Sequence, residues 1–213
     1  REGRVRVQDQ GSQLAALALV RVRDVAQGEK WLDLCAGPGG KAALLAAEAL
    51  QHGATLTCNE LLPHRAKLVK QALSSVDTQI KVTVEDGRKY SEKHAQEFDR
   101  ILLDAPCTGL GALRRRPESR WRKQQTDVAD LTKLQEELLQ SAWSCLKPGG
   151  VLAYVTCSPH PAETTAILSK HLSKHKDAEL VDAGKVLESI SDEFMPNPNR
   201  KTVQLWPHTN DTD

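Results

Sequence analysis

Short apolar runs alternate with longer segments that carry apolar residues at helical spacing along most of the chain. Apolar runs typical of buried strands are residues 30–35, 54–60, 80–86, 98–107 and 151–158. Leu- and Ala-rich segments with helical spacing occupy 41–53, 63–76, 130–150 and about 162–175. Because right-handed crossovers place helices over both faces of a sheet, this alternation predicts an α/β fold with a doubly wound, mainly parallel sheet.

The two ends of the chain and one internal stretch depart from this alternation. Residues 12–25 predict a first helix with Ser12 as its N-cap. The polar, Arg-rich stretch 108–126 predicts a long loop. Residues 203–207 (VQLWP) predict a late strand, and Pro196 and Pro198 mark the loop before it.

Length and composition favour one compact domain. We expect residues 1–213 to form a single domain in which residues 1–29 are a helical lead-in. The chain begins at Arg1 without a methionine, which favours an excised part of a longer protein. No run of 18 apolar residues occurs and the N-terminus lacks the apolar core of a secretory signal, so we expect a cytoplasmic protein that does not bind a membrane.

Charge and cysteine content narrow the function classes further. The 29 basic and 28 acidic side chains nearly cancel, so net charge neither predicts nor excludes a polyanionic partner. The five cysteines are an odd number with no CxxC pair and no Cys/His cluster at metal-ligand spacing. We therefore expect neither a disulfide framework nor a metal site. We also expect the protein to be a monomer.

A glycine-rich turn follows the first predicted strand. Cys35-Ala36-Gly37-Pro38-Gly39-Gly40-Lys41 leads directly into a helix, and glycines at such a turn let the backbone approach a ligand closely. Its GxGG spacing differs from a Walker A loop, which requires GxxxxGK followed by Ser or Thr, and it lacks the third glycine of the dinucleotide pattern. A tight turn that merely needs glycine remains an alternative for this loop alone.

Carboxylates end the next two predicted strands. Glu60 ends the second strand, where it is placed to accept both hydroxyls of a ribose, and Asp86 ends the third, where it is placed to accept from an adenine amino group. With the glycine turn, they predict a site for an adenosine-containing ligand. Asp33 fits a helix cap or a solvated turn residue instead.

Two cysteines and an aspartate occupy the ends of the fourth and fifth predicted strands. Asp104 and Cys107 follow the fourth strand in DAPC, and Cys157 follows the fifth in TCSP. Because these strands are neighbours beyond the switch point of a doubly wound sheet, both cysteines should face one crevice beside the nucleotide. We interpret Cys58 and Cys145 as small core residues.

Basic residues crowd into the stretch that follows DAPC. The predicted RNA-contacting residues of this arm are Arg114, Arg115, Arg116, Arg120, Trp121 and Arg122, and Lys123 follows them. Arginines offer phosphate contacts and a tryptophan offers base stacking, although a solvated charged loop remains the alternative for basic runs in general. A target carbon hidden in a stacked helix would have to be presented on an unpaired or flipped base.

Three motifs resemble those of a known enzyme family. LDLCAGPGGK, LLDAPCTGLGALRRRPESRWR and LAYVTCSPHPAE are similar to the first, fourth and sixth motifs of the Nop2/Sun family of RNA cytosine-5 methyltransferases. Within that family the chain most resembles the bacterial Sun (Fmu) type, which acts on small-subunit ribosomal RNA. The resemblance extends from Val7 over nearly the whole chain and implies a Rossmann-like class I fold that uses S-adenosyl-L-methionine (SAM).

The resemblance also implies roles for individual residues. The family's nucleophile falls on Cys157, the cysteine linked to release of the methylated product falls on Cys107, and Asp104 would line the cofactor and target-base pockets. The cofactor-binding residues implied are Cys35, Ala36, Gly37, Pro38, Gly39, Gly40, Lys41, Glu60, Arg65, Asp86, Gly87 and Asp104.

Two rival functions remain to be weighed, and the sequence differs from the family pattern at both ends. A DNA cytosine-5 methyltransferase would use the Pro-Cys cysteine as nucleophile together with a Glu-Asn-Val motif, which this chain lacks. A SAM-binding scaffold that docks on ribosomal RNA without catalysis is the alternative from another class, and the presence of both cysteines and Asp104 argues against it. The resemblance further implies an N-terminal NusB-like domain and a last antiparallel strand, neither of which this sequence contains.

Overall fold

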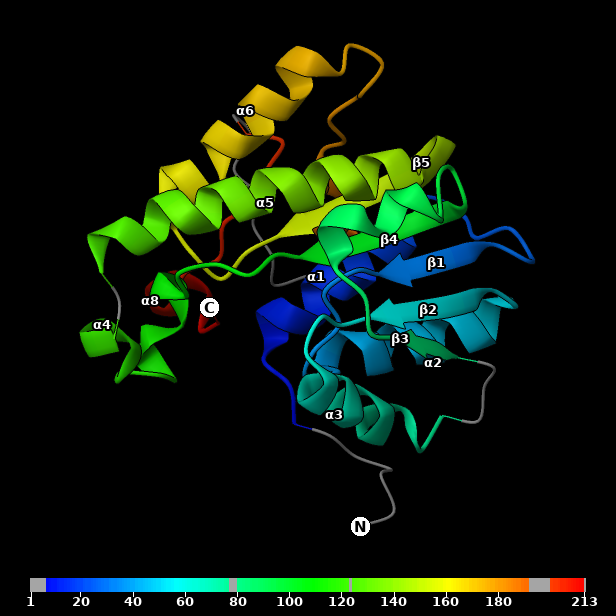
Figure 1. Cartoon of the computed structure of the whole chain (residues 1–213), viewed down its shortest axis with the longest axis horizontal. Helices are drawn as coiled ribbons and strands as arrows, with labels where there is room; N and C mark the ends of the chain where they lie inside the picture. The colour runs from blue at the N-terminus through cyan, green and yellow to red at the C-terminus, as the bar shows by residue number, and fades with distance from the viewer. Residues whose placement is uncertain (1–6, 77–79, 123, 192–199, 213) are drawn as a thin grey trace.

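The chain folds around a single five-stranded parallel sheet (Figure 1). The computed structural model describes residues 7–76, 80–122, 124–191 and 200–212. The strands are β1 (Lys30–Asp33), β2 (Thr55–Asn59), β3 (Lys81–Thr83), β4 (Phe98–Asp104) and β5 (Leu146–Val155). Their order β3-β2-β1-β4-β5, with every neighbouring pair parallel, confirms the predicted doubly wound topology.

Helices cover both faces of the sheet, as the alternating pattern predicts (Figure 1). The longer helices are α1 (Gln10–Arg21), α2 (Gly40–His52), α3 (Pro63–Leu73), α5 (Gln125–Cys145), α6 (Thr165–Lys174) and α7 (Ala183–Glu188). The shorter ones are α4 (Ser119–Arg122), α8 (Pro207–Asn210) and the 3-10 turns η1 (Gly87–Glu92), η2 (Leu110–Arg114) and η3 (Pro161–Glu163). One apolar core joins α1, α2 and α3 to one face, and a second joins η1, α5 and α6 to the other.

Some predicted boundaries differ from those in the structure. Asp9, not Ser12, caps α1, because its carboxylate accepts the backbone N–H of Ser12 at 3.3 Å. The stretch 108–126 is not one loop: it contains η2, α4 and the first residues of α5, which starts with a capping box between Gln124 and Asp127. The strand β5 begins at Leu146, so it takes in the Lys-Pro-Gly-Gly segment that we expected to end a helix.

The predicted late strand at 203–207 is wrong for the described residues. Residues 203–206 form no ladder with any of the five strands, and Pro207 begins α8. Proline at the first helical position is favourable because its missing N–H has no partner in a helix anyway. Pro196 and Pro198, which we expected to mark the preceding loop, lie outside the described residues.

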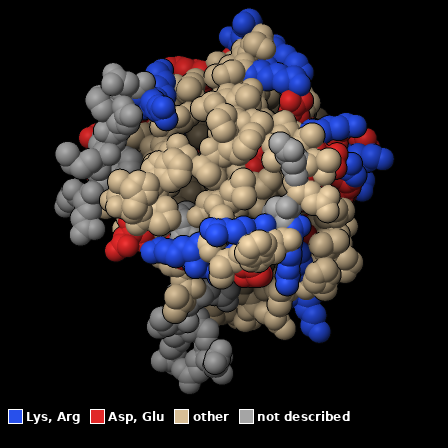
Figure 2. All heavy atoms as spheres, turned by 90° about the vertical axis from the view of Figure 1, so that its left-hand side faces the viewer, with Lys and Arg blue, Asp and Glu red and all other residues tan. Residues whose placement is uncertain are grey.

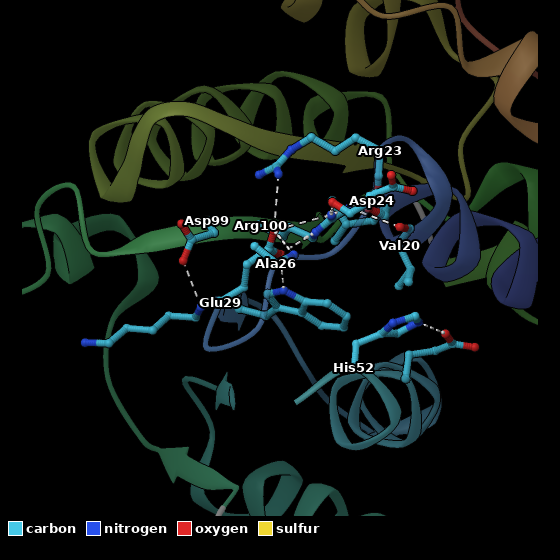
Figure 3. Close-up of polar contacts among 12 residues, drawn as sticks. Val20, Arg23, Asp24, Ala26, Glu29, His52, Asp99 and Arg100 are labelled. Atoms are coloured by element: carbon cyan, nitrogen blue, oxygen red, sulfur yellow. Dashed lines mark hydrogen bonds and ion pairs between the residues drawn. The ribbon is translucent and has the colours of Figure 1, made fainter. Parts of the chain in front are cut away.

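A buried arginine fastens α1 to the sheet. Arg100 of β4 is completely buried, and its Nε donates to Oε2 of Glu29 at 2.7 Å (Figure 3). Its other nitrogens donate to the backbone carbonyls of Leu19, Val20, Arg23 and Asp24. These carbonyls lie at the C-terminal end of α1 and beyond it, where no helical N–H remains to bond them. The lead-in helix is therefore an integral part of the domain.

No helix among the described residues combines the length and the apolar character needed to cross a bilayer.

Candidate active site

The turn between β1 and α2 presses its backbone against the end of β2 and against α3. Gly39 is the N-cap of α2 and has a φ of 106°, a conformation that side chains rarely adopt. A Cβ atom on Gly37 would lie 2.2 Å from Oε2 of Glu60, and one on Gly39 would lie 2.5 Å from Cβ of Ala72. Both positions therefore require glycine, and the turn brings backbone up to the acidic end of β2.

Glu60 is the centre of a small polar group at that point. Its buried carboxylate accepts the backbone N–H of Gly37 at 3.1 Å and that of Leu62 at 3.0 Å. Arg65 of α3 pairs with Glu60 at 3.5 Å and donates from Nη2 to the carbonyl oxygen of Gly37 at 2.6 Å. The structure thus brings together three of the residues that we predicted to hold the cofactor.

Asp86 was predicted to end the third strand, but β3 ends at Thr83, so Asp86 lies three residues beyond it. It also has a partner that the sequence did not indicate. Its carboxylate accepts the backbone N–H of Arg88 at 3.0 Å and the Arg88 guanidinium at 2.6 Å. These side-chain hydrogen bonds from Arg88 hold the pKa of Asp86 below its usual range. A Cβ on the neighbouring Gly87 would lie 2.8 Å from Cδ2 of Leu138, so η1 packs closely on α5.

Asn59 is a positioning residue that sequence reasoning missed. Its buried side chain donates to the carbonyl oxygens of Leu34 at 3.2 Å and Glu85 at 3.1 Å, and its Oδ1 accepts from Oγ1 of Thr83 at 2.9 Å. One amide therefore ties together the chain segments that leave β1, β2 and β3. A single Asn inside an apolar run carries no recognisable signal in one sequence, because its partners are distant along the chain.

Asp33 is not the cap or solvated residue that we expected. It is 1% exposed, and neither carboxylate oxygen has a hydrogen-bond partner among the described residues. Burial, followed by the neighbouring carboxylate of Asp104, raises the pKa of Asp33 to about 8. A buried polar group without a partner is rare in a folded protein and marks a place where a ligand group can supply the missing contact.

Lys41 connects the glycine turn to the other half of the sheet. Its Nζ lies 2.8 Å from Oδ2 of Asp104 at the end of β4 and 3.3 Å from Oγ of Ser12 in α1. The Lys41 side chain is mostly buried, whereas a third of the Asp104 side chain is exposed. The pair therefore places one cation and one anion in the groove that Cys157 also lines.

The two cysteines predicted to act together are in contact. Sγ of Cys107 and Sγ of Cys157 lie 3.3 Å apart, and Cys157 is the more exposed of the two. The hydrogen bond from Cys107 lowers the pKa of Cys157 to about 7, with Lys41 contributing in the same direction. The same hydrogen bond, with burial, raises the pKa of Cys107 well above its usual range.

The other three cysteines differ from Cys157 in the direction of their pKa shift. Burial raises the pKa of Cys35 and Cys58 well above the usual range and that of Cys145 to about 12. Cys157 is therefore the one cysteine of the five whose environment favours the thiolate.

The basic arm lies beside the cysteines. Its arginines are exposed, and Trp121 on α4 is 85% exposed. Lys and Arg side chains gather across the middle of the face that carries α4 (Figure 2). Arg114 and Arg115 line the same broad groove as Lys41, Asp104 and Cys157. Arg114 also contacts Asp211 near the C-terminus, with its Nη2 donating to the carbonyl oxygen at 3.0 Å.

A second missed residue lies between the two cysteine loops. Glu163 is fully buried and accepts hydrogen bonds from Thr108, next to Cys107, and from Ser158, next to Cys157. Sequence reasoning quoted Glu163 within the LAYVTCSPHPAE motif but gave it no role. Its spacing of six residues from Cys157 is the signal that points to it, because the short turn η3 folds the carboxylate back towards the loop that carries Cys157.

Comparison with known proteins identifies the family. A sequence profile described as 16S rRNA methyltransferase RsmB/F matches residues 20–213. The chain is 48% identical over 213 residues to Rv1407 of Mycobacterium tuberculosis strain H37Rv, named as a methyltransferase, a match covering 100% of the chain and 45% of the relative. It is 37% identical over 214 residues to ribosomal RNA small subunit methyltransferase B of Serratia proteamaculans, covering 100% of the chain and 46% of the relative.

Solved structures agree with this assignment. PH0851 superposes with a TM-score of 0.84 and 32% identity, covering 99% of the chain and 45% of that protein. NSun6 from Pyrococcus horikoshii, solved with SFG, superposes with a TM-score of 0.69 and 25% identity, covering 78% of the chain and 41% of that protein. The chain spans less than half the length of each of these relatives. From the profile match and the identities, the chain belongs to the RsmB/F family of 16S rRNA methyltransferases.

Proposed function

We propose that this chain methylates carbon 5 of a cytosine in 16S ribosomal RNA with SAM as the methyl donor. In this proposal Cys157 attacks carbon 6 of the base, and Cys107 assists release of the product. The observation that carries the proposal is the 3.3 Å contact between the two sulfurs, in which Cys157 is the thiol whose pKa is lowered. Family membership supports the reaction class and the substrate class.

The residues around the glycine turn fit SAM. The backbone of the turn, Glu60 and Asp86 supply hydrogen-bond acceptors and donors suited to a ribose and an adenine, and Arg65 steadies Glu60. The buried carboxyl group of Asp33 has no hydrogen-bond partner among the described residues, so a polar group of the ligand can supply one, and the Asp104 carboxylate lies at the same end of the site. When bound there, SAM supplies an electrophilic methyl group on a sulfonium.

Carbon 5 of cytosine is too weak a nucleophile to react without activation. Addition of the Cys157 thiolate to carbon 6 makes carbon 5 enamine-like, which is the purpose of covalent catalysis here. Asp104 lies where its carboxyl group is suited to hydrogen-bond the ring nitrogen and amino edge, and Lys41 holds that carboxyl group in place at 2.8 Å. Lys41 also favours the Cys157 thiolate by its charge.

The step that ends the reaction requires loss of the carbon 5 proton and departure of Cys157. Cys107 is suited to assist because its sulfur already lies at hydrogen-bond distance from the leaving sulfur. A base takes the carbon 5 proton, the C5=C6 double bond re-forms, and the bond from carbon 6 to Cys157 breaks so that Cys157 leaves as a thiolate. The raised pKa of Cys107 keeps it a thiol, which can donate a hydrogen bond to that departing thiolate.

The basic arm is proposed to bind the RNA backbone beside the target base. Exposed guanidinium groups neutralise phosphates, and an exposed indole offers a surface for a base to stack on. The predicted RNA-contacting residues remain Arg114, Arg115, Arg116, Arg120, Trp121 and Arg122. Because Arg114 and Arg115 share a groove with Cys157, RNA held by the arm is close to the nucleophile.

We further propose that residues 1–213 act as one catalytic domain with residues 1–29 as its helical lead-in. The support comes from Arg100, which bonds the lead-in to β4 through Glu29 and four backbone carbonyls.

A mechanism-based trap tests the covalent step. RNA that contains 5-fluorocytosine should form a SAM-dependent adduct stable to denaturing electrophoresis, because fluorine blocks the elimination that normally frees the enzyme. The variant Cys157→Ala should form no adduct, while Cys107→Ala should form it and should also accumulate an adduct on natural cytosine. Cys145→Ala is the matched control, since this cysteine is completely buried and is not among the residues that line the groove, and it should behave as the unmodified protein.

An adduct that survives Cys157→Ala and vanishes in Cys107→Ala would reverse the two roles. That result would match the pattern of the DNA cytosine-5 methyltransferases, in which the cysteine of the Pro-Cys motif attacks the base.

A further inference from the structure

The carboxylate of Glu163 joins the two cysteine loops at one point. Its Oε1 accepts the backbone N–H of Thr108 at 2.8 Å and Nε2 of Gln135 at 3.0 Å. Its Oε2 accepts the hydroxyl of Thr108 at 2.5 Å and the hydroxyl of Ser158 at 2.5 Å. The residue after Cys107 and the residue after Cys157 are therefore bonded to the same side chain.

Two further hydrogen bonds hold Glu163 and its partner Gln135 in place. Nε2 of Gln135 on α5 also donates to the carbonyl oxygen of Pro106 at 2.8 Å, and the hydroxyl of Tyr154 on β5 donates to the backbone carbonyl of Glu163 at 2.9 Å. Burial alone would raise the pKa of Glu163, but the hydrogen bonds from Ser158 and Thr108 outweigh it and lower the pKa. The carboxylate thus stays ionised and fully bonded inside the protein.

A second contact joins the backbones of the two loops directly. The backbone N–H of Gly111 donates to the carbonyl oxygen of Cys157 at 2.9 Å. A Cβ on Gly111 would lie 2.8 Å from that oxygen, so the two backbones are as close as they can pack. Glu163 and Gly111 therefore join the Cys107 loop to the Cys157 loop at two separate points.

We propose that Glu163 is a positioning residue that keeps the Cys107 thiol at the Cys157 sulfur during both attack and release. The inference rests on the proposed function, because it assigns both sulfurs a part in the same reaction. Attack needs the Cys107 hydrogen bond to favour the Cys157 thiolate, and release needs the same thiol beside the departing sulfur. One carboxylate bonded to both loops serves both steps, which separate anchors for each loop would not do.

The two oxygens of Glu163 receive different kinds of donor, and this distinguishes two variants. Oε1 takes two N–H groups of fixed direction, whereas Oε2 takes two hydroxyls that can turn round and accept instead. Glu163→Gln can therefore keep the four contacts with its amide nitrogen at the hydroxyl side, although it loses the charge. Glu163→Ala loses all four contacts.

Oxidation of the purified protein with diamide measures the separation of the sulfurs directly. The two thiols lose their protons and two electrons to the azo nitrogens of diamide, which become a hydrazine, and a Cys107–Cys157 disulfide forms. Since small misplacements of reacting groups slow such steps steeply, Glu163→Ala should form this disulfide about tenfold more slowly or worse, and Glu163→Gln should fall between it and the unmodified protein. Peptide mass spectrometry identifies the disulfide.

A matched control separates positioning from general loss of a glutamate. Glu136 on α5 pairs with Lys170 at 2.7 Å near the surface, so Glu136→Ala removes a bonded carboxylate away from the sulfurs. This variant should oxidise at the unmodified rate. Thermal unfolding of each variant, measured by circular dichroism, shows whether the folded protein is present in the assay.

Variants on each side of the carboxylate test the coupling of the two steps. Thr108→Val should chiefly slow release of the methylated product, because it loosens the Cys107 loop, and Ser158→Ala should chiefly slow formation of the 5-fluorocytosine adduct. Glu163→Ala should slow both, and adding Thr108→Val to it should cost little more, since the shared partner is already gone. Stopped reactions with labelled RNA measure the two rates separately.

The disulfide rates decide whether Glu163 positions the two sulfurs. A folded Glu163→Ala that forms the disulfide at the unmodified rate shows that the carboxylate does not set the sulfur distance. If Glu163→Ala does not fold, Thr108→Val and Ser158→Ala decide, and unmodified disulfide rates in both would overturn it equally. A failed 5-fluorocytosine trap with a slowed disulfide rate would instead reject the proposed function alone, because diamide oxidation needs neither RNA nor SAM.

Discussion

Replacing Arg100 by methionine removes the guanidinium that fastens α1 to β4 and leaves an apolar side chain of similar reach. Arg100 is completely buried, and its partner Glu29 has a side chain only 4% exposed. After the substitution, Glu29 keeps the indole N–H of Trp31 at 2.8 Å and the more exposed Arg23 at 3.1 Å. The variant therefore buries a carboxylate that has lost its main countercharge.

The size of the effect follows from the cost of leaving one buried charge without its partner. Removing one partner of a buried ion pair costs about 3–5 kcal/mol, because the remaining charge stays desolvated. The four backbone carbonyls that lose Arg100 add about 1 kcal/mol in total if water reaches most of them. We expect a loss of about 5 kcal/mol in the free energy of unfolding, or about 10–20 °C in melting temperature for a chain of this length.

Urea unfolding followed by circular dichroism measures this loss, and Arg23→Met is the matched control. Arg23 pairs with the same carboxylate, but its side chain is 41% exposed, so its removal should cost only about 0.2–1 kcal/mol. A loss below about 1 kcal/mol for Arg100→Met, or equal losses for the two variants, would refute the view that burial makes the Arg100 contact strong.

The pH dependence gives an independent check on the same reasoning. Burial would raise the pKa of Glu29, but hydrogen bonds from Arg100 and Trp31 outweigh it and lower the pKa from 4.5 to about 2. The stability from this pairing is present above pH 4.5 and is lost as the pH falls through 2. In Arg100→Met, burial should raise the Glu29 pKa, so the stability gap to the unmodified protein should be widest at pH 7 and narrow towards pH 4.

Two further predictions follow from buried or paired groups in the active site. The rate of Cys157 alkylation by iodoacetamide, followed by mass spectrometry, should rise with pH and have a midpoint near pH 7. Cys107→Ala should move that midpoint to higher pH, because it removes the main cause of the lowered Cys157 pKa. An unchanged midpoint would contradict the S–H···S contact. Burial and Asp104 raise the pKa of Asp33 from 3.8 to about 8, so the folded state gives up stability as the pH rises between these values. Asp33→Asn should therefore raise the melting temperature more at pH 8 than at pH 5, and an equal change at both pH values would show that Asp33 does not hold a proton in the folded state.

The order of strands could be predicted from the sequence because it depends on local patterns. Short apolar runs alternating with amphipathic segments leave few topologies once crossovers must be right-handed. The boundaries that were wrong depend on partners instead. Residues 203–207 have the composition of a strand, but a strand exists only where a neighbour supplies hydrogen bonds, and in the described residues none does. Serine is a favourable N-cap residue, but in the structure the Asp9 carboxylate accepts the backbone N–H of Ser12, so the helix begins earlier.

The site residues divide in the same way. The sequence could single out Cys107, Cys157 and Glu60 as candidates because each stands at the end of a predicted strand, where a parallel sheet gathers its side chains. The sequence analysis missed or misjudged Asn59, Asp33 and Glu163. The importance of each depends on neighbouring groups that are distant along the chain. Asp33 is a buried carboxylate without a partner, which no single sequence reveals, since burial of a residue at a turn depends on packing of the whole domain.

The opposite pKa shifts of Cys107 and Cys157 also arise from the groups that surround each thiol rather than from the sequence of either motif. A hydrogen bond between two thiols can stabilise only one thiolate, and which one is decided by solvent access and nearby charge. Cys157 is the more exposed, and the Lys41 ammonium favours its thiolate, while Cys107 is more enclosed and its pKa is raised. Glu163 holds both backbones through neighbouring residues and so leaves this balance to the electrostatics of the groove. The same backbone frame would therefore support attack by either cysteine, and the hydrogen bond from Cys107, with a smaller contribution from Lys41 that Asp104 opposes, is what favours the Cys157 thiolate here.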